Sequence, residues 1–207
     1  MNEGRKASVA FSQAGAWIIL TPWSVSTGEK RYDRGCPMTN DLFRRQLGAY
    51  AAVHRDWRNK ATHFVGIPII VFSLLLLLSL WTFQLGGREW TVSLAVAIVA
   101  VLGWMALDLG IGLAMALIMA VAWLAAEALA GALGSASAVW MAFIALFVGG
   151  WVLQFVGHHY EGKRPALLDN VFQAFIGPMF LVAESFVVMG QRSDLADAMG
   201  EGDVTAR

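Results

Sequence analysis

The most constraining feature of the sequence is a series of four long apolar stretches in its middle. An α-helix needs about 20 mostly apolar residues to cross the hydrocarbon core of a bilayer, and each stretch comes close to that length. The stretches are residues 64–85, 90–107, 109–133 and 136–157. Only 14% of the 207 residues are charged, whereas an ordinary soluble domain carries about 25%. The sequence therefore predicts an all-α fold, a polytopic membrane helical bundle with four transmembrane spans.

The two middle stretches are separated by very few residues. Asp108 stands between them, and the flexible Gly110 and Gly112 follow it. We therefore expect a tight helical hairpin with a carboxylate at its turn. Small residues such as Gly103 and Ala114 recur inside the stretches, and such residues let helix backbones approach closely in lipid. The bundle should be compact.

Basic residues gather at both ends of the apolar region. Lysine and arginine accumulate on the cytoplasmic side of membrane proteins, and the loop at Gly134 and Ser135 carries no charge. The basic residues nearest the first stretch and the last are Arg44, Arg45, Arg55, Arg58, Lys60, Lys163 and Arg164. We therefore expect a multi-pass protein of a bacterial inner membrane, with its N-terminus, the Asp108 turn and the segment after the fourth span at the cytoplasmic face.

The segments outside the four stretches differ in composition. Residues 1–37 mix charged residues with Ser, Gly and Pro, which predicts a disordered leader. Met38 is a candidate physiological start, in which case residues 1–37 are not translated. Residues 38–190 are expected to form the membrane domain, and residues 191–207 a flexible acidic tail.

A fifth apolar stretch, residues 171–190, has three interpretations. It contains Gln173, Pro178 and Glu184, which weaken it as an isolated span. It could be a fifth span, a re-entrant pair broken at Gly177 and Pro178, or an interfacial helix. We favour an amphipathic or re-entrant helix.

Composition excludes several kinds of site. Fifteen basic and fifteen acidic residues cancel, so no overall field favours nucleic acid. The single cysteine, Cys36, excludes an intramolecular disulfide and a cysteine-based metal cluster within one chain. Histidine and carboxylate remain as metal ligands.

The first histidine pair, His54 and His63, lies just before and within the start of the first span. At about 100° per residue, a spacing of nine places the two side chains on opposite faces of one helix. Presenting both to one metal therefore requires a break between them. We expect an amphipathic helix over residues 41–53 that ends near His54, with Asn59 as the N-cap of the next helix and His63 in the first turn of the span.

The second pair, His158 and His159, lies at the end of the fourth span. Gln154, His158 and Glu161 share one helical face, whereas His159 points about 100° away. Two histidines and a carboxylate around open positions are typical of non-haem iron oxygenases. Candidate ligands are His54, His63, His158, Glu161 and His159, and candidates to orient the imidazoles through hydrogen bonds are Asp56, Asn59, Gln154, Asp108 and Asn170. Histidines are also common near membrane interfaces, so a structural role stays open.

Two strings of residues carry a resemblance to a known family. The first runs from Tyr50 through His54, Asn59 and His63 to Gly66 and Pro68. The second is the run from Gln154 to Leu167, which continues into residues 169–170. Together they resemble the membrane-protein family that includes the fungal endoplasmic-reticulum 2-hydroxy fatty acid dioxygenase and many bacterial members. The resemblance covers residues 41–190.

The resemblance implies an Fe(II)-dependent enzyme of fatty acid α-oxidation, which converts a 2-hydroxy fatty acid and O2 to an acid one carbon shorter. By the matching motifs, the resemblance also implies that His54, His63 and His158 are essential histidines. The fungal pattern has one more residue between the last histidine and the glutamate, so Glu161 matches it less closely. A 2-hydroxy acid can chelate iron through two oxygens, its chain needs an apolar slot, and its carboxylate could lie beside Lys163 or Arg164.

Other functions stay open on the sequence alone. A non-catalytic lipid-binding or assembly protein could use the histidines structurally, and a zinc hydrolase could use the same ligands. A transporter has little support, because no internal repeat is visible. A homo-oligomer is compatible with the sequence.

Overall fold

The computed structural model describes residues 9–11, 17–19, 39–162 and 171–200. The chain forms two units, Met1–Arg34 and Gly35–Arg207. In the first unit, β1 (Val9–Phe11) and β2 (Trp17–Ile19) pair antiparallel. This part of the predicted disordered leader therefore has secondary structure. The rest of the leader and Met38 lie outside the described residues.

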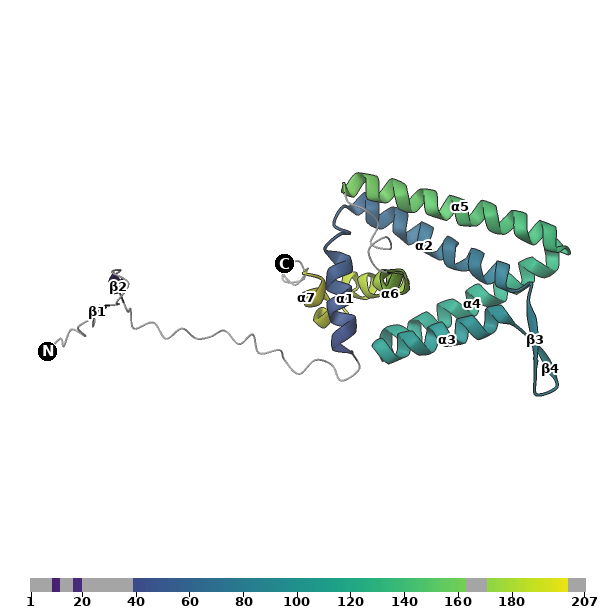
Figure 1. Ribbon diagram of the computed structural model, residues 1–207, viewed down its shortest axis with the longest axis horizontal. Helices are drawn as coiled ribbons and strands as arrows, with labels where there is room; N and C mark the ends of the chain where they lie inside the picture. Colours follow the sequence, from purple (N-terminus) through teal and green to yellow (C-terminus); the bar gives the residue numbers. More distant parts are fainter. Residues whose placement is uncertain (1–8, 12–16, 20–38, 163–170, 201–207) are drawn as a thin grey trace. The chain divides into compact units, whose positions relative to one another are not determined.

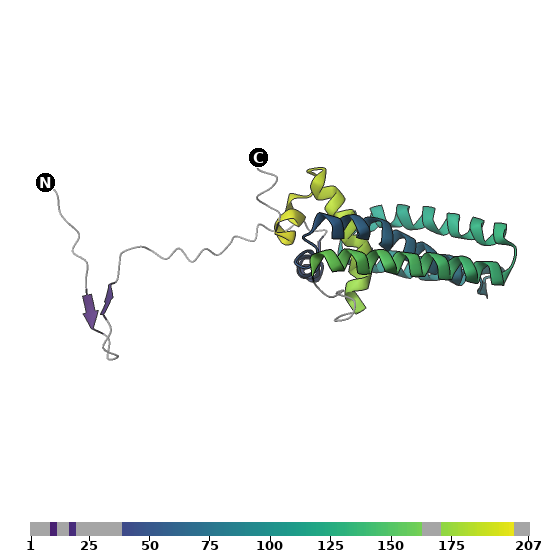
Figure 2. The same ribbon diagram turned by 90° about the horizontal axis from the view of Figure 1, so that it is seen from above.

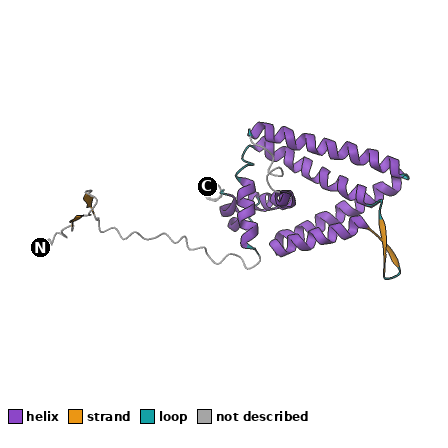
Figure 3. Ribbon diagram, viewed as in Figure 1, coloured by secondary structure: helices purple, strands orange, loops and turns teal. Residues whose placement is uncertain are grey.

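The second unit is helical, as predicted, apart from one β-hairpin (Figure 3). Its helices are α1 (Asp41–Ala51), α2 (Trp57–Leu78), α3 (Val92–Leu107), α4 (Leu109–Leu133), α5 (Ala136–Glu161), α6 (Val171–Val188) and α7 (Ser193–Met199). By length and composition α2, α4 and α5 can cross a membrane, whereas α3 has 16 residues and is shorter. The all-α membrane class is confirmed.

The first span differs from the prediction of residues 64–85. The helix α2 runs from Trp57 to Leu78, and Thr82–Leu85 forms strand β3, which pairs with β4 (Arg88–Thr91). Gly86 and Gly87 both have positive φ at the turn, as a two-residue hairpin of type I′ requires. Residues 82–85 therefore belong to a hairpin between two membrane helices.

Two helix pairs make up the long part of the unit, and a cap of three further helices lies across one end (Figures 1 and 2). In these views α2 lies along α5, and α3 lies along α4. The cap consists of α1, α6 and α7, at the end where α2 begins and α5 ends. The helix α6 continues through Pro178, so the re-entrant pair broken at Gly177 and Pro178 is wrong. Its course across the bundle fits the interfacial interpretation.

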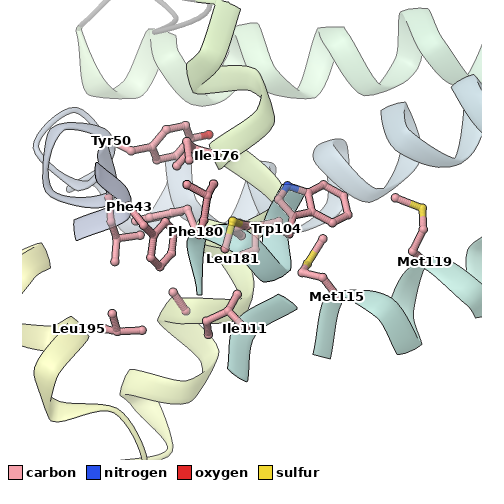
Figure 4. Close-up of a cluster of buried hydrophobic side chains, with 14 of the residues drawn as sticks. Phe43, Tyr50, Trp104, Ile111, Met115, Met119, Ile176, Phe180, Leu181 and Leu195 are labelled. Atoms are coloured by element: carbon pink, nitrogen blue, oxygen red, sulfur yellow. The ribbon is translucent and has the colours of Figure 1, made fainter. Parts of the chain in front are cut away.

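The buried apolar side chains of the cap join those of the long helices in one cluster (Figure 4). Phe43, Phe180 and Leu195, from three different helices, are fully buried. Trp104 of α3 donates a hydrogen bond from Nε1 to the carbonyl oxygen of Phe175 at 3.0 Å and stacks on its ring. These contacts bury apolar surface between the cap and the long helices, and such burial stabilises a fold in proportion to its area.

Close glycine contacts join α2 to α5. A Cβ atom on Gly150 would lie 2.6 Å from Ile70 Cγ1, which is too close for any real side chain. A Cβ on Gly66 would overlap the Gln154 amide nitrogen, and one on Gly157 would overlap the Thr62 hydroxyl. The two backbones therefore approach as closely as small residues allow. This contact fixes the relative positions of the side chains of α2 and α5 at the end where α2 begins and α5 ends.

Asp108 lies at the turn between α3 and α4, where it was predicted, but it does not contact the histidines. Its carboxylate accepts hydrogen bonds from Ile111 N at 2.8 Å, Thr39 Oγ1 at 2.5 Å and Arg192 Nη2 at 2.8 Å. Arg192 also bonds Asp194. Asp108 therefore ties the hairpin to the start of α7, and none of these hydrogen bonds involves an imidazole.

The predicted flexible tail begins with ordered structure. The helix α7 buries Leu195, Ala196 and Met199, and its N-cap residue Arg192 joins Asp108. Apolar burial and this ion pair hold the segment in place. Residues 201–207 lie outside the described residues.

A carboxylate also lies at the other end of the bundle. Glu127 Oε1 accepts hydrogen bonds from Thr91 Oγ1 at 2.7 Å, Ser93 Oγ at 2.5 Å and Trp123 Nε1 at 3.0 Å. Carboxylates inside membrane segments are costly unless paired or hydrogen-bonded. Glu127 therefore fixes the start of α3 against α4.

We predict that Asp108→Asn destabilises the protein. Hydrogen bonds to charged groups contribute about 1.5–3 kcal/mol each, and the substitution removes the buried one of the two carboxylates that bind Arg192, leaving Asp194 as the other. The unfolding free energy in detergent should fall by about 2 kcal/mol or more. The matched control, Asp197→Asn, changes an exposed carboxylate on α7 and should leave stability within about 0.5 kcal/mol. Equal stability of the two variants would contradict this role.

Candidate metal centre

The corner between α1 and α2 positions His54. The helix α1 ends at Ala51, and α2 begins after Asp56, whose side chain accepts a hydrogen bond from Arg58 N at 2.8 Å. The required break between His54 and His63 is therefore present. The N-cap is Asp56 and not Asn59, because α2 begins earlier than expected and Asn59 lies inside it. For the same reason His63 lies in the second turn of the helix.

Three histidines from three parts of the chain meet at this corner. His54, His63 and His158 have relative exposures of 1%, 2% and 5%. Their ring centroids are 4.6 Å apart for His54 and His63, 5.1 Å for His54 and His158, and 4.9 Å for His63 and His158. One ligand nitrogen from each lies within 4.8 Å of the other two. The arrangement could hold one metal ion.

Backbone carbonyl groups fix the tautomers of two of the rings. Nδ1 of His54 lies 2.7 Å from the Tyr50 carbonyl oxygen, and Nδ1 of His63 lies 2.8 Å from that of Asn59. A carbonyl oxygen can only accept, so each Nδ1 carries the proton and each Nε2 presents a lone pair. Histidines that bind metals characteristically donate their second ring N–H in this way.

The two Nε2 atoms then face each other at 3.1 Å. Two lone pairs at this distance repel unless a proton or a cation lies between them. Burial lowers the pKa of His54 to about 4, so a proton is not retained there at neutral pH. His158 Nδ1 is buried without a hydrogen-bond partner among the described residues. These features fit a metal ion bound by neutral imidazoles.

Aromatic rings from the cap close one side of the group. The Tyr50 ring stacks on His54 with centroids 4.0 Å apart, and Phe180 lies 4.7 Å from Tyr50 and 5.8 Å from His54. Figure 4 shows Tyr50 beside Ile176 of α6. This wall keeps water away from the imidazoles. Tyr50 and Phe180 were not among the predicted site residues, although Tyr50 opens the first family string.

Glu161 has a different position from that of a ligand. Its carboxylate accepts hydrogen bonds from Arg55 N at 3.1 Å, Asp56 N at 2.8 Å and Asn59 Nδ2 at 3.3 Å. The end of α5 therefore holds the backbone segment that contains His54 and the start of α2. An anion at a helix N-terminus is stabilised by the free N–H groups and the helix dipole. Here Glu161 positions a histidine and is not in the group of ligand atoms.

The remaining predicted residues are distributed around the site. His159 is exposed and outside the three-histidine group. Gln154 is buried one turn before His158, and Asn59 orients His63 through its backbone oxygen. Asp56 caps α2, and its side chain bonds the backbone of Arg58 and not an imidazole. Asn170, Lys163 and Arg164 lie outside the described residues, and their roles stay predictions.

A buried ion pair near the histidines was missed in the sequence. Lys60 Nζ of α2 lies 2.5 Å from Glu184 Oε1 of α6, and both side chains are largely buried. This pair holds α6 against the first turn of α2. The signal was present, because a carboxylate within an apolar stretch requires a partner, but only the fold identifies Lys60 as that partner.

The fold and the site define a membrane-embedded helical protein with a buried three-histidine group. The chain belongs to the Mpo1-like family, described as "2-hydroxy-palmitic acid dioxygenase Mpo1-like", whose family model matches residues 41–189. The resemblance seen in the two strings is therefore confirmed. A curated relative is the 2-hydroxy-palmitic acid dioxygenase MPO1 of Saccharomyces cerevisiae, which is 29% identical over 150 residues, 71% of this chain and 81% of the relative. No solved structure matches the chain.

We predict that each of the variants His54→Ala, His63→Ala and His158→Ala loses its bound metal. Each removes one of three converging nitrogens, so the expected metal content falls from about one ion per chain to near zero. Elemental analysis of anaerobically purified protein measures this. The control is His159→Ala, which should keep its metal because the ring lies outside the group. Loss of metal in the control, or full content in the other three, would contradict the site.

We predict that Glu161→Gln weakens metal binding without abolishing it. The amide oxygen can still accept hydrogen bonds, but the charge that holds residues 54–56 is lost. Removing a group that orients a ligand typically lowers metal affinity about 10–100-fold. Titration with Fe(II) under anaerobic conditions gives the affinity and the final stoichiometry. If Glu161→Gln binds no metal even at saturation, the carboxylate is itself a ligand.

Proposed function

We propose that the protein is an Fe(II)-dependent dioxygenase of fatty acid α-oxidation. It converts a 2-hydroxy fatty acid and O2 to a fatty acid one carbon shorter, and the atoms balance with CO2 and water as the other products. Membership of the Mpo1-like family supports the reaction class. The convergence of His54, His63 and His158 is the observation that carries the proposal.

The donor set suits iron. Three neutral imidazoles leave further coordination positions for other ligands, and imidazole is a common ligand of iron, zinc, copper and nickel. When bound, Fe(II) supplies the redox chemistry that O2 requires. A 2-hydroxy acid offers a carboxylate and a hydroxyl oxygen on adjacent carbons, so it can chelate a metal ion through both oxygens. An acid without the hydroxyl group lacks the second of these two donors.

The chain's own residues contribute orientation and exclusion of water. The carbonyl groups of Tyr50 and Asn59 hold two rings with their Nε2 atoms turned inward. The stacked ring of Tyr50 and the side chain of Phe180 shield them. Because the rings are already held in this orientation, they need little reorganisation to bind a metal ion. Such preorganisation is what a functional site requires.

The substrate's carboxylate needs a cationic partner beside the imidazoles. Lys163 and Arg164 follow α5 directly in the sequence, and we propose that they attract it. The basic residues on either side of the spans support a cytoplasmic location of this end. We also propose a bacterial inner membrane as the location. A substrate that is itself a lipid can then reach the site from the bilayer.

A non-catalytic lipid-binding or assembly protein is the second candidate. One observation favours it: His54 also contributes to packing. Its ring stacks on Tyr50, and its Nδ1 donates to the Tyr50 carbonyl oxygen at the corner between α1 and α2. In that case the metal-free protein stays folded and His63→Ala keeps its function. Measurements of metal content and of turnover distinguish the non-catalytic protein from the dioxygenase.

We predict that the iron-loaded protein consumes O2 with 2-hydroxypalmitate and not with palmitate. The reason is chelation, which requires both oxygens of the 2-hydroxy acid. An oxygen electrode with anaerobically purified, Fe(II)-loaded protein in detergent measures the rate, and product analysis should show pentadecanoic acid. The His63→Ala variant is the inactive control. Stoichiometric Fe(II) with no O2 uptake for any 2-hydroxy acid would exclude the reaction and leave the metal site standing.

A further inference from the structure

Next to the histidines, the bundle contains an apolar cavity of about 240 Å³ between α2, α4 and α6. Its walls are formed by Phe64, Ile67, Pro68, Val71, Met115, Ile118, Met119, Ala122, Pro178, Leu181, Val182 and Ser185. We infer that this cavity holds the part of the substrate's acyl chain nearest the head group and that the end of the cavity remote from His63 contacts long chains and not short ones. The inference rests on the proposed function for the identity of the head group, but binding of the chain can be measured separately.

The cavity begins where the metal centre ends. Phe64 follows His63 directly on α2, and Ile67 lies one turn further along the same helix. A Cβ on Gly177 would lie 3.3 Å from Ile67 Cδ1 and 3.2 Å from Tyr50 Oη. Tyr50 in turn stacks on His54. Gly177 therefore lies between Tyr50, which packs on the histidine group, and Ile67, which lines the cavity.

The lining matches a hydrocarbon and not a polar ligand. Ser185 is the one lining residue with a hydroxyl group, and its Oγ donates to the Leu181 carbonyl oxygen at 2.9 Å. All other lining side chains are apolar. A helix of a partner protein, with a diameter of about 10–12 Å, does not fit into a space of this volume. One acyl chain does.

The dimensions fit part of a long chain. Phe64 and Val71 are seven residues apart on α2, which at 1.5 Å per residue is about 10 Å. Met115 and Ala122 have the same separation on α4. A methylene group takes up about as much room as a water molecule, so the cavity holds roughly eight methylenes. The end formed by Val71, Met119 and Ala122 is the end remote from His63.

Two of the residues that line the cavity are also exposed. Phe64 and Ile118 have relative exposures of 40% and 51%. They belong to spans that face lipid, so a chain can pass between α2 and α4 without crossing water. The occupant is therefore a fatty acyl chain that enters sideways from the membrane. Burial at about 0.8 kcal/mol per methylene relative to water also keeps the chain out of solvent.

The inference can be tested by placing a bulky residue at the end of the cavity remote from His63. Ala122→Phe should lower the rate of O2 consumption with 2-hydroxypalmitate at least about tenfold relative to wild type. The rate with 2-hydroxyoctanoate should stay within about twofold, because the short chain does not reach this end. Retained iron content and retained activity on the short acid show that the variant is folded.

The matched control is Ala120→Phe. Ala120 is on the same helix two residues earlier but is exposed on the outside of the bundle, so the added ring points into lipid. Its chain-length profile should be that of the wild type. Equal profiles for Ala122→Phe and Ala120→Phe, or a similar loss for both acids in Ala122→Phe alone, would overturn the inference.

A second measurement does not depend on turnover. A 2-hydroxypalmitate analogue with a diazirine about eight carbons from its 2-hydroxy group, the length of chain that the cavity holds, is photo-crosslinked to the anaerobic wild-type protein, and the labelled peptides are mapped by mass spectrometry. We expect label at Met119 and Ala122 that excess 2-hydroxypalmitate displaces. Label confined to lipid-facing positions such as Leu117 and Val121 would overturn the inference. Displaceable label in the cavity without any O2 uptake would keep the acyl site and exclude the proposed reaction.

Discussion

The close contact between α2 and α5 is the constraint on which the rest of the structure depends. Gly66, Gly150 and Gly157 remove side-chain bulk where the two helices meet, so that His63 and His158 face each other across the contact. His54 joins them only because the chain breaks before α2. In lipid, such packing is driven by van der Waals contact and interhelical hydrogen bonds. A side chain at any of these glycines would push α2 and α5 apart and so separate the histidine ligands. Both helices would still be long and apolar enough to span the membrane.

Much of this arrangement could be predicted from local signals in the sequence. The apolar stretches predicted the membrane helices because hydrophobicity and length alone identify a span. The nine-residue spacing of His54 and His63 required a break, because one straight helix cannot turn both rings to one side. The shared face of Gln154 and His158 followed from helical periodicity in the same way. Each of these inferences needs only one segment of the chain.

Several differences from the predictions concern contacts between distant segments. Asp108 was a candidate to orient the imidazoles, but its ion-pair partner is Arg192, 84 residues later. Glu161 was a candidate ligand because it shares a helical face with His158; its carboxylate accepts hydrogen bonds from the backbone of Arg55 and Asp56, and its role as a ligand stays a prediction. The strand at 82–85 was included in the first span, although Thr82 and Gln84 make it less apolar than the helix before it. The Gly86-Gly87 pair, with positive φ at both residues, was a local signal of the hairpin turn. Periodicity does not indicate which distant element a side chain meets.

The most direct test of the central claim counts the imidazoles on the metal. Iron K-edge X-ray absorption of the anaerobic, Fe(II)-loaded protein reports both the number of histidine ligands, from their multiple-scattering features, and the metal–nitrogen distance. The account predicts three imidazoles at a distance close to the roughly 2.1 Å typical of metal–histidine bonds. A spectrum with one imidazole or none would show that the three rings at the α1–α2 corner do not share an ion, and the catalytic proposal would then be wrong.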